Sequence, residues 1–176
     1  WVAWLLSHSV SGATVPVTTS RAMVVSQTRW ASEVGSAVLA EGGNAVDAAV
    51  ATAFALAVTY PAAGNIGGGG FLVYRAASGD SIAYDFRERA PTGAHPEMWL
   101  TDGVYDADKH HSSHLAVGVP GSVAGLHLAW SDHGALPWDR LVFPAIALAR
   151  EGITVSHGLA DSLARSRDRW ERYAAS

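Results

Sequence analysis

The sequence contains no cysteine, and this absence excludes several kinds of site at once. Without thiols the chain can form no disulfide framework, zinc ribbon, iron–sulfur cluster or cysteine nucleophile. Any covalent catalysis therefore has to use oxygen or nitrogen. Charged residues are also scarce, at 16% of 176 residues, whereas apolar residues make up 49%. This composition favours a packed globular chain over a disordered one.

Positive charge and long apolar runs are scarce as well. Twelve basic residues stand against 16 acidic ones, for a formal net charge of -4, and the basic residues are scattered along the chain. We therefore expect no nucleic-acid partner. The longest apolar run, at residues 48–58, is shorter than the roughly 20 residues that cross a bilayer, so we expect no membrane span. At roughly 100–200 residues per domain, the chain is one domain or part of one.

The two ends of the chain differ from its middle. Residues 1–20 begin with an apolar stretch and continue with small and polar residues. We interpret them as a leader or the remnant of a signal peptide, which implies a periplasmic or extracellular location; the alternative is a disordered or tag-like leader. Residues 161–176 have a helical pattern that stops without a capping residue, so we expect the natural protein to continue.

Between the ends, apolar periodicity and turn residues predict a mixture of helices and strands. Gly42 supplies a left-handed residue that ends the first helix, and Asn44 caps a mostly buried second one. A turn at 78–80 joins two strands into a hairpin. The predicted helices lie at about 30–39, 45–60, 123–130, 139–150 and 161–176, and the predicted strands at 22–25, 71–75 and 81–86. This mixture predicts an α+β fold in which helices cover a sheet.

Four consecutive glycines, at residues 67–70, resemble at first sight a phosphate-binding loop. Such a loop needs a Lys-Ser/Thr pair that opens a helix, whereas here a strand follows the glycines. We therefore interpret them as a tight turn that presses closely against another part of the chain, where glycine leaves the backbone free to adopt positive φ.

Three histidines, at 110, 111 and 114, have spacings that a metal ion could use. They lie in the polar stretch 91–113 and its continuation, where no predicted helix fixes the directions of the side chains. We therefore expect a solvated loop, no metal site and no cofactor.

Arg87 is the best candidate for binding a small molecule. It follows the second hairpin strand, where a side chain can point into a cleft at the edge of a sheet. Its planar fork of donors suits a carboxylate, and Asp85 or Glu88 could hold the fork in place. The alternative is an internal ion pair among the charges of the stretch 85–89.

Several motifs in this order and spacing resemble the gamma-glutamyltranspeptidase family over residues 22–163. They include Gly-Asn-Ile-Gly-Gly-Gly-Gly-Phe at 64–71 and Asp-Phe-Arg-Glu followed by Ala-Pro at 85–91, together with stretches at 31–32, 42–51, 116–121, 136–138, 144–146 and 149–152. The resemblance implies an N-terminal-nucleophile hydrolase with an αββα sandwich, made as one precursor that cuts itself into a large and a small subunit. Residues 21–176 would form the N-terminal part of the large subunit.

The resemblance also implies a chemistry and a partner. A threonine at the start of the small subunit would attack the gamma-amide of glutathione or a similar compound and pass the gamma-glutamyl group to water or to an amino acid. No catalytic residue is then expected within this chain, which alone should be inactive. Arg87 matches the family arginine that grips the α-carboxylate of the glutamyl group, and Glu88 would support it.

Two stretches, 28–30 and 60–65, depart from the family pattern. They leave open the acceptor and whether the natural amide is glutathione. An acylase of the same family, acting on glutaryl or cephalosporin-type amides, and a non-catalytic scaffold module remain the alternatives.

Overall fold

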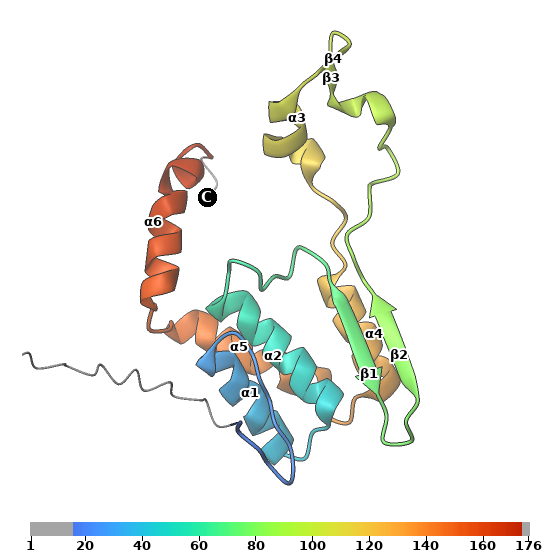
Figure 1. Cartoon of the computed structure of the whole chain (residues 1–176), viewed down its shortest axis with the longest axis vertical. Helices are drawn as coiled ribbons and strands as arrows, with labels where there is room; N and C mark the ends of the chain where they lie inside the picture. The colour runs from blue at the N-terminus through green and yellow to red at the C-terminus, as the bar shows by residue number, and fades with distance from the viewer. Residues whose placement is uncertain (1–15, 174–176) are drawn as a thin grey trace, which may run out of the picture.

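The computed structural model describes residues 16–173 of the chain. Most of the expected leader, residues 1–15, therefore lies outside the described residues, and residues 16–20 are exposed and have no regular secondary structure. The remainder combines six α-helices and two small antiparallel sheets within the described range. Four of the helices gather at the base of the molecule, and the longer hairpin lies along one side of them, whereas α3 (Ala107–Ser112) and α6 (His157–Glu171) lie apart from this group (Figure 1).

Helices α1 (Arg29–Ala40) and α2 (Ala45–Thr59) form the predicted pair. Gly42, with φ of 96°, reverses the chain after α1, and this conformation is one that residues with a side chain rarely adopt. Asn44 then caps α2 by accepting hydrogen bonds from the backbone of Val46 and Asp47, while Asp47 accepts one from the Asn44 backbone. The cap satisfies donors that a helix start would otherwise leave unpaired, so the predictions for both helices are confirmed.

The strand predicted at residues 22–25 is wrong. These residues have no regular structure, and Val25 is 81% exposed, whereas Val24 packs against the core. Within the described residues they have no neighbouring strand to pair with, so a local run of apolar residues does not become part of a sheet.

The predicted hairpin is confirmed as β1 (Phe71–Arg75) and β2 (Ser81–Asp85), which pair antiparallel with Phe71 opposite Asp85. Leu72, Tyr74 and Tyr84 turn toward the helices and contact the core. The opposite face of the hairpin carries Phe71 and Val73, which are exposed. The alternation follows from the period of two along a strand.

The stretch predicted to be irregular, 91–113, instead forms an arm that rises away from the helices (Figure 1). Because its elements are only two to six residues long, apolar periodicity does not detect them. The Asp106 carboxylate caps the short helix that follows it and also accepts a hydrogen bond from the Thr101 hydroxyl. These hydrogen bonds lower the pKa of the Asp106 carboxyl. The arm and the segment after it contain η1 (Pro96–Trp99), β3 (Leu100–Thr101), β4 (Val104–Tyr105), α3 (Ala107–Ser112) and η2 (His114–Ala116).

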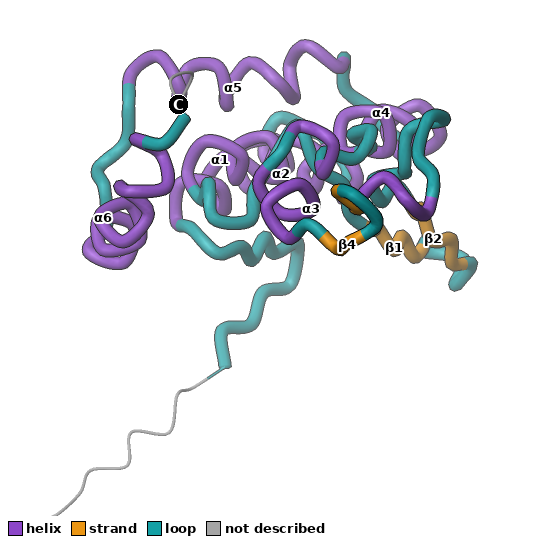
Figure 2. The backbone as a smooth tube through the Cα atoms, turned by 90° about the horizontal axis from the view of Figure 1, so that it is seen from above, coloured by secondary structure: helices purple, strands orange, loops and turns teal. Residues whose placement is uncertain are grey.

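Three further helices follow the arm: α4 (Ser122–His133), α5 (Trp138–Glu151) and α6 (His157–Glu171). The prediction of a helix in each of these three places is confirmed, although α6 begins before the predicted residue, at the cap Ser156. Viewed from above, α5 runs along one side of the α1–α2 pair, and α4 lies nearer the hairpin (Figure 2).

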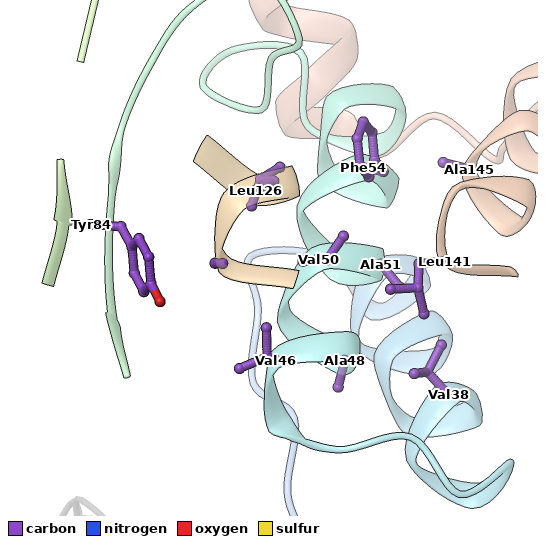
Figure 3. Packing of buried hydrophobic residues seen from close by; sticks show 11 residues of the cluster. Val38, Val46, Ala48, Val50, Ala51, Phe54, Tyr84, Leu126, Leu141 and Ala145 are labelled. Atoms are coloured by element: carbon purple, nitrogen blue, oxygen red, sulfur yellow. The ribbon is translucent and has the colours of Figure 1, made fainter. Parts of the chain in front are cut away.

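The core surrounds α2, whose small residues let its neighbours approach closely. Val50 and Ala51 are fully buried, and the cluster around them includes side chains from α1, α4, α5 and β2 (Figure 3). Leu141 of α5 is also fully buried, and burying a side chain of this size stabilises the fold by about 1.5–3 kcal/mol. The predicted burial of α2 on most faces is therefore confirmed.

The fold is thus mixed, with helices packed against one face of a hairpin, as the α+β prediction requires. The described residues contain two separate two-stranded sheets, β1–β2 and β3–β4. The stacked sheets of the αββα sandwich are not assembled within them. No helix between residues 16 and 173 combines the length and hydropathy that crossing a membrane requires.

Candidate substrate-binding site

The candidate site lies where the chain leaves β2. The Phe86 backbone N–H donates to the carbonyl of Gly70 at 3.1 Å, so the hairpin ladder extends one bond past Asp85. After Arg87, the backbone of Arg89 pairs with Val119 in an isolated antiparallel bridge, with N···O distances of 3.3 and 2.8 Å. The backbone of Arg87 therefore lies between two points of backbone pairing, whereas its side chain is largely exposed to solvent.

Glycines from two separate stretches of the chain pack closely against the backbone of this segment. A Cβ placed on Gly69 would lie 2.7 Å from both the Phe86 carbonyl oxygen and the Glu88 nitrogen, and 2.8 Å from the Arg87 Cα. A Cβ on Gly121 would collide with the Phe86 carbonyl. The close approach predicted for the glycine segment is thus confirmed, and its partner is the chain around Arg87. None of residues 67–70 uses the freedom of glycine to adopt positive φ.

The guanidinium of Arg87 remains largely available to a ligand. Its side chain is 67% exposed, and its ion pair within the described residues is with Glu88, whose Oε2 lies 3.8 Å from Nε. A pair this long and this exposed contributes little, so it does not hold the fork shut. The alternative, an internal ion pair within the stretch 85–89, is therefore present as the Arg87–Glu88 pair, but this pair is long and exposed and leaves the guanidinium accessible.

The two acids beside Arg87 have different contacts. The Asp85 carboxylate accepts a hydrogen bond from the Arg87 backbone N–H at 3.0 Å, which fixes the turn after β2. Glu88 is the acid nearer to the guanidinium, at a distance too long for a hydrogen bond. Asp85 and Glu88 were both expected to hold the Arg87 guanidinium in place. Asp85 instead binds the Arg87 backbone, and Glu88 is the acid that lies beside the guanidinium.

A cavity of about 400 Å³ opens next to Arg87. Its walls come from the end of β2 and from the first two turns of α4, and they are mainly apolar. Such a concave surface with a few polar groups is the usual form of a small-molecule site. The lining includes Tyr84, Arg87, Arg89, Val119, Ala124 and Leu128.

Tyr84 fixes the wall of this cavity to α4. Its hydroxyl donates to the Asp132 carboxylate at 2.8 Å. Burial raises the pKa of the Tyr84 phenol above its ordinary value of 10.0, and the hydrogen bond to Asp132 raises it further. Sequence analysis did not find this pair, because its members are 48 residues apart along the chain and each is an ordinary residue of its element.

The three candidate metal-binding histidines do not form a site with one another. His110 and His111 lie in the short helix α3, not in a loop, and their rings stack at 4.3 Å with 29° between the planes. Both rings contact the Tyr105 hydroxyl, at 2.8 and 3.2 Å. The described part of the chain contains no cluster of three potential His, Cys, Asp or Glu ligands.

Comparisons with known proteins agree on one class. The family profile described as Gamma-glutamyltranspeptidase matches residues 31–175. The glutathione hydrolase proenzyme of Escherichia coli (strain K12) is 51% identical over 149 residues, or 84% of this chain and 26% of that protein. The crystal structure of Helicobacter pylori gamma-glutamyltranspeptidase matches with a TM-score of 0.87 and 44% identity, over 92% of this chain and 46% of that one.

A more distant solved structure is that of cephalosporin acylase from Bacillus halodurans, with a TM-score of 0.70 and 28% identity over 90% of this chain and 31% of that one. These matches share one fold and centre on one family of sequences. This chain belongs to the gamma-glutamyltranspeptidase family. It spans about a quarter of the length of the E. coli relative, 26%.

Proposed function

We propose that this chain supplies the carboxylate-binding arginine of an enzyme that hydrolyses or transfers the gamma-glutamyl group of glutathione-like amides. The observation that carries the proposal is the largely exposed Arg87 side chain, which contributes to the lining of a cavity. Membership of the family supports it, since relatives carry the names glutathione hydrolase and gamma-glutamyltranspeptidase.

Arg87 acts by orientation. Two parallel N–H donors of the guanidinium bind the two oxygens of the substrate α-carboxylate, which fixes both the position and the direction of the glutamyl chain. The gamma-carbonyl is then presented at a constant distance from the arginine. Holding a reacting group in this way removes part of the entropic barrier to attack. Glu88 assists by placing a negative charge beside the guanidinium, with its Oε2 3.8 Å from Nε.

The covalent step belongs to a threonine in a small subunit outside this chain. The threonine oxygen forms a bond to the carbonyl carbon of the gamma-amide while its α-amine takes the hydroxyl proton, and the C–N bond of that amide then breaks as the proton passes to the leaving amine. Water or an amino acid attacks the resulting ester and releases the threonine. On its own the chain lacks the nucleophile, so we expect it to be inactive.

The same proposal includes the architecture and the location. Residues 21–176 form the N-terminal part of a large subunit, and the small subunit completes an αββα sandwich. The exposed face of the β1–β2 hairpin, with Phe71 and Val73, is available for such completion. Residues 1–20 act as a leader that directs the protein to the periplasm or the cell exterior.

The structural likeness to a cephalosporin acylase supports a second candidate, cleavage of glutaryl or related amides. A glutaryl group retains the carboxylate that Arg87 would bind and lacks only the α-amino group, so the arginine serves either substrate. The groups of the protein that distinguish a gamma-glutamyl from a glutaryl substrate therefore lie where the α-amine binds.

The test is turnover by the complete protein of gamma-glutamyl-p-nitroanilide and glutaryl-p-nitroanilide. We expect the gamma-glutamyl compound to be cleaved with the higher kcat/KM. Equal or faster cleavage of the glutaryl compound would establish the acylase instead. Absence of turnover with both, in a folded protein, would support the scaffold module and contradict the proposed function.

A further inference from the structure

The glycine segment before β1 connects the start of α4 to the backbone around Arg87. The carbonyl of Gly68 accepts hydrogen bonds from the backbone N–H groups of Gly121, at 2.8 Å, and Ser122, at 3.0 Å. The carbonyl of Gly70 accepts one from Phe86 at 3.1 Å. The segment thus lies between the first residues of α4 and the exit of β2, and is bonded to both.

Two side chains set the position of this segment. The Asn65 Oδ1 accepts a hydrogen bond from the Gly68 N–H at 2.9 Å and lies 2.5 Å from the Ser122 hydroxyl oxygen, which donates to it. The Asn65 Nδ2 donates to the carbonyl of Ala63 at 3.1 Å. Ser122 is only 4% exposed, so its hydroxyl is a buried group whose hydrogen bond has structural consequences.

The segment transmits its position to Arg87 by contact. A Cβ on Gly69 would lie 2.7–2.8 Å from three backbone atoms of residues 86–88. The glycine segment and the segment around Arg87 are therefore in direct backbone contact, with no room for a side chain between them. A shift of the glycine segment therefore displaces the Arg87 backbone. The guanidinium lies at the far end of a long side chain, so a small tilt of the backbone moves it further.

We propose that Asn65 and Ser122 are positioning residues, which act through Gly69 to hold Arg87 in the orientation that binds a substrate carboxylate. This inference rests on the proposed function of Arg87. Neither side chain touches the substrate in this account. Removing the Ser122 hydroxyl loosens the glycine segment, and the arginine then samples orientations that miss the carboxylate.

The experiment compares Ser122→Ala with Ser122→Thr in the complete protein, using gamma-glutamyl-p-nitroanilide. We expect Ser122→Ala to raise KM about 10-fold with little change in kcat, as for loss of binding that is equal in the ground and transition states. Threonine retains the hydroxyl and should restore KM to within about 3-fold of the original. Ser131→Ala, on the same helix at an exposed position, is the matched control and should leave both constants unchanged.

A double-mutant cycle with Arg87→Lys separates positioning from general damage. If Ser122 acts through Arg87, adding Ser122→Ala to Arg87→Lys should raise KM less than about 2-fold further, whereas independent effects would multiply. Multiplication of the two effects, or an unchanged KM in Ser122→Ala, overturns the positioning role. If Ser122→Ala does not fold, Asn65→Ala, at the exposed partner of the same hydrogen bond, replaces it in the cycle, with the same non-additivity expected.

The same measurements distinguish failure of the positioning role of Ser122 from failure of the proposed function of Arg87. A large loss in Arg87→Lys together with an unchanged Ser122→Ala contradicts only the positioning role. An unchanged Arg87→Lys contradicts the proposed function itself.

Discussion

Asp47 is a buried carboxylate whose removal should be among the more damaging single changes in the chain. It is 0% exposed and lies in the first turn of α2. Its oxygens accept from the Asn44 backbone at 2.9 Å and from the Ala135 backbone at 3.1 Å, with a weaker contact to Leu136 at 3.4 Å. The residue therefore joins the start of α2 to the loop between α4 and α5.

The size of the effect of Asp47→Ala follows from these bonds. Two good hydrogen bonds to a charged acceptor, at about 1.5–3 kcal/mol each, amount to about 3–6 kcal/mol. Because Ala135 is exposed, water can replace the carboxylate at its N–H, which lowers the expected loss to about 2–4 kcal/mol. Asp47→Asn keeps one acceptor oxygen, so we expect a smaller loss.

The assay is denaturant unfolding of the complete protein, followed by tryptophan fluorescence. Trp130 reports on the junction, because its Nε1 donates to the Leu136 carbonyl at 2.7 Å. Glu41→Ala is the matched control, since this carboxylate is 51% exposed and pairs with Arg140 at 3.0 Å; it should cost no more than about 1 kcal/mol. An Asp47→Ala loss as small as that of the control would refute the reasoning.

Two further predictions concern the core and the cavity wall. Leu141→Ala empties a fully buried site and should lower the free energy of unfolding by about 2–5 kcal/mol in the same assay; a loss near zero would contradict the described core. Since the folded state raises the pKa of Tyr84 above 10.0, the unfolded state loses this proton first, so the stability that the phenol contributes is present below pH 10.0 and declines above it. Unfolding measured from pH 8 to about 11 should therefore show the difference between the original protein and Tyr84→Phe shrinking, and a difference that is constant or grows would contradict the assignment.

Local signals in the sequence predicted most of the helices and the hairpin. Gly42 and Asn44 mark the boundary between α1 and α2 by backbone conformation and capping, and both effects act over a few residues. The strand predicted at 22–25 shows the limit of such signals. An apolar run becomes a strand only where another strand pairs with it, and that depends on distant parts of the chain.

The candidate site was predictable in part for the same reason. The position of Arg87 after a strand follows from the hairpin pattern and from the motif that surrounds it. The cavity beside Arg87 and the close contacts to its backbone do not follow from these local patterns. They depend on Gly69, Gly121 and Ser122, which come from separate stretches of the sequence. Periodicity describes single elements, and contacts between elements need the assembled fold.

The central claim is that the Arg87 guanidinium grips the substrate through two parallel hydrogen bonds. Its most direct test is kcat/KM for gamma-glutamyl-p-nitroanilide in the complete protein carrying Arg87→Lys, beside Arg75→Lys at the opposite end of the same hairpin. We expect lysine at 87 to lower kcat/KM by about 100-fold, roughly 2.7 kcal/mol, because an ammonium cannot reproduce the planar fork. Arg75→Lys should have no effect. A loss at Arg87 of about 1 kcal/mol or less, the size of a surface ion pair, would contradict the account.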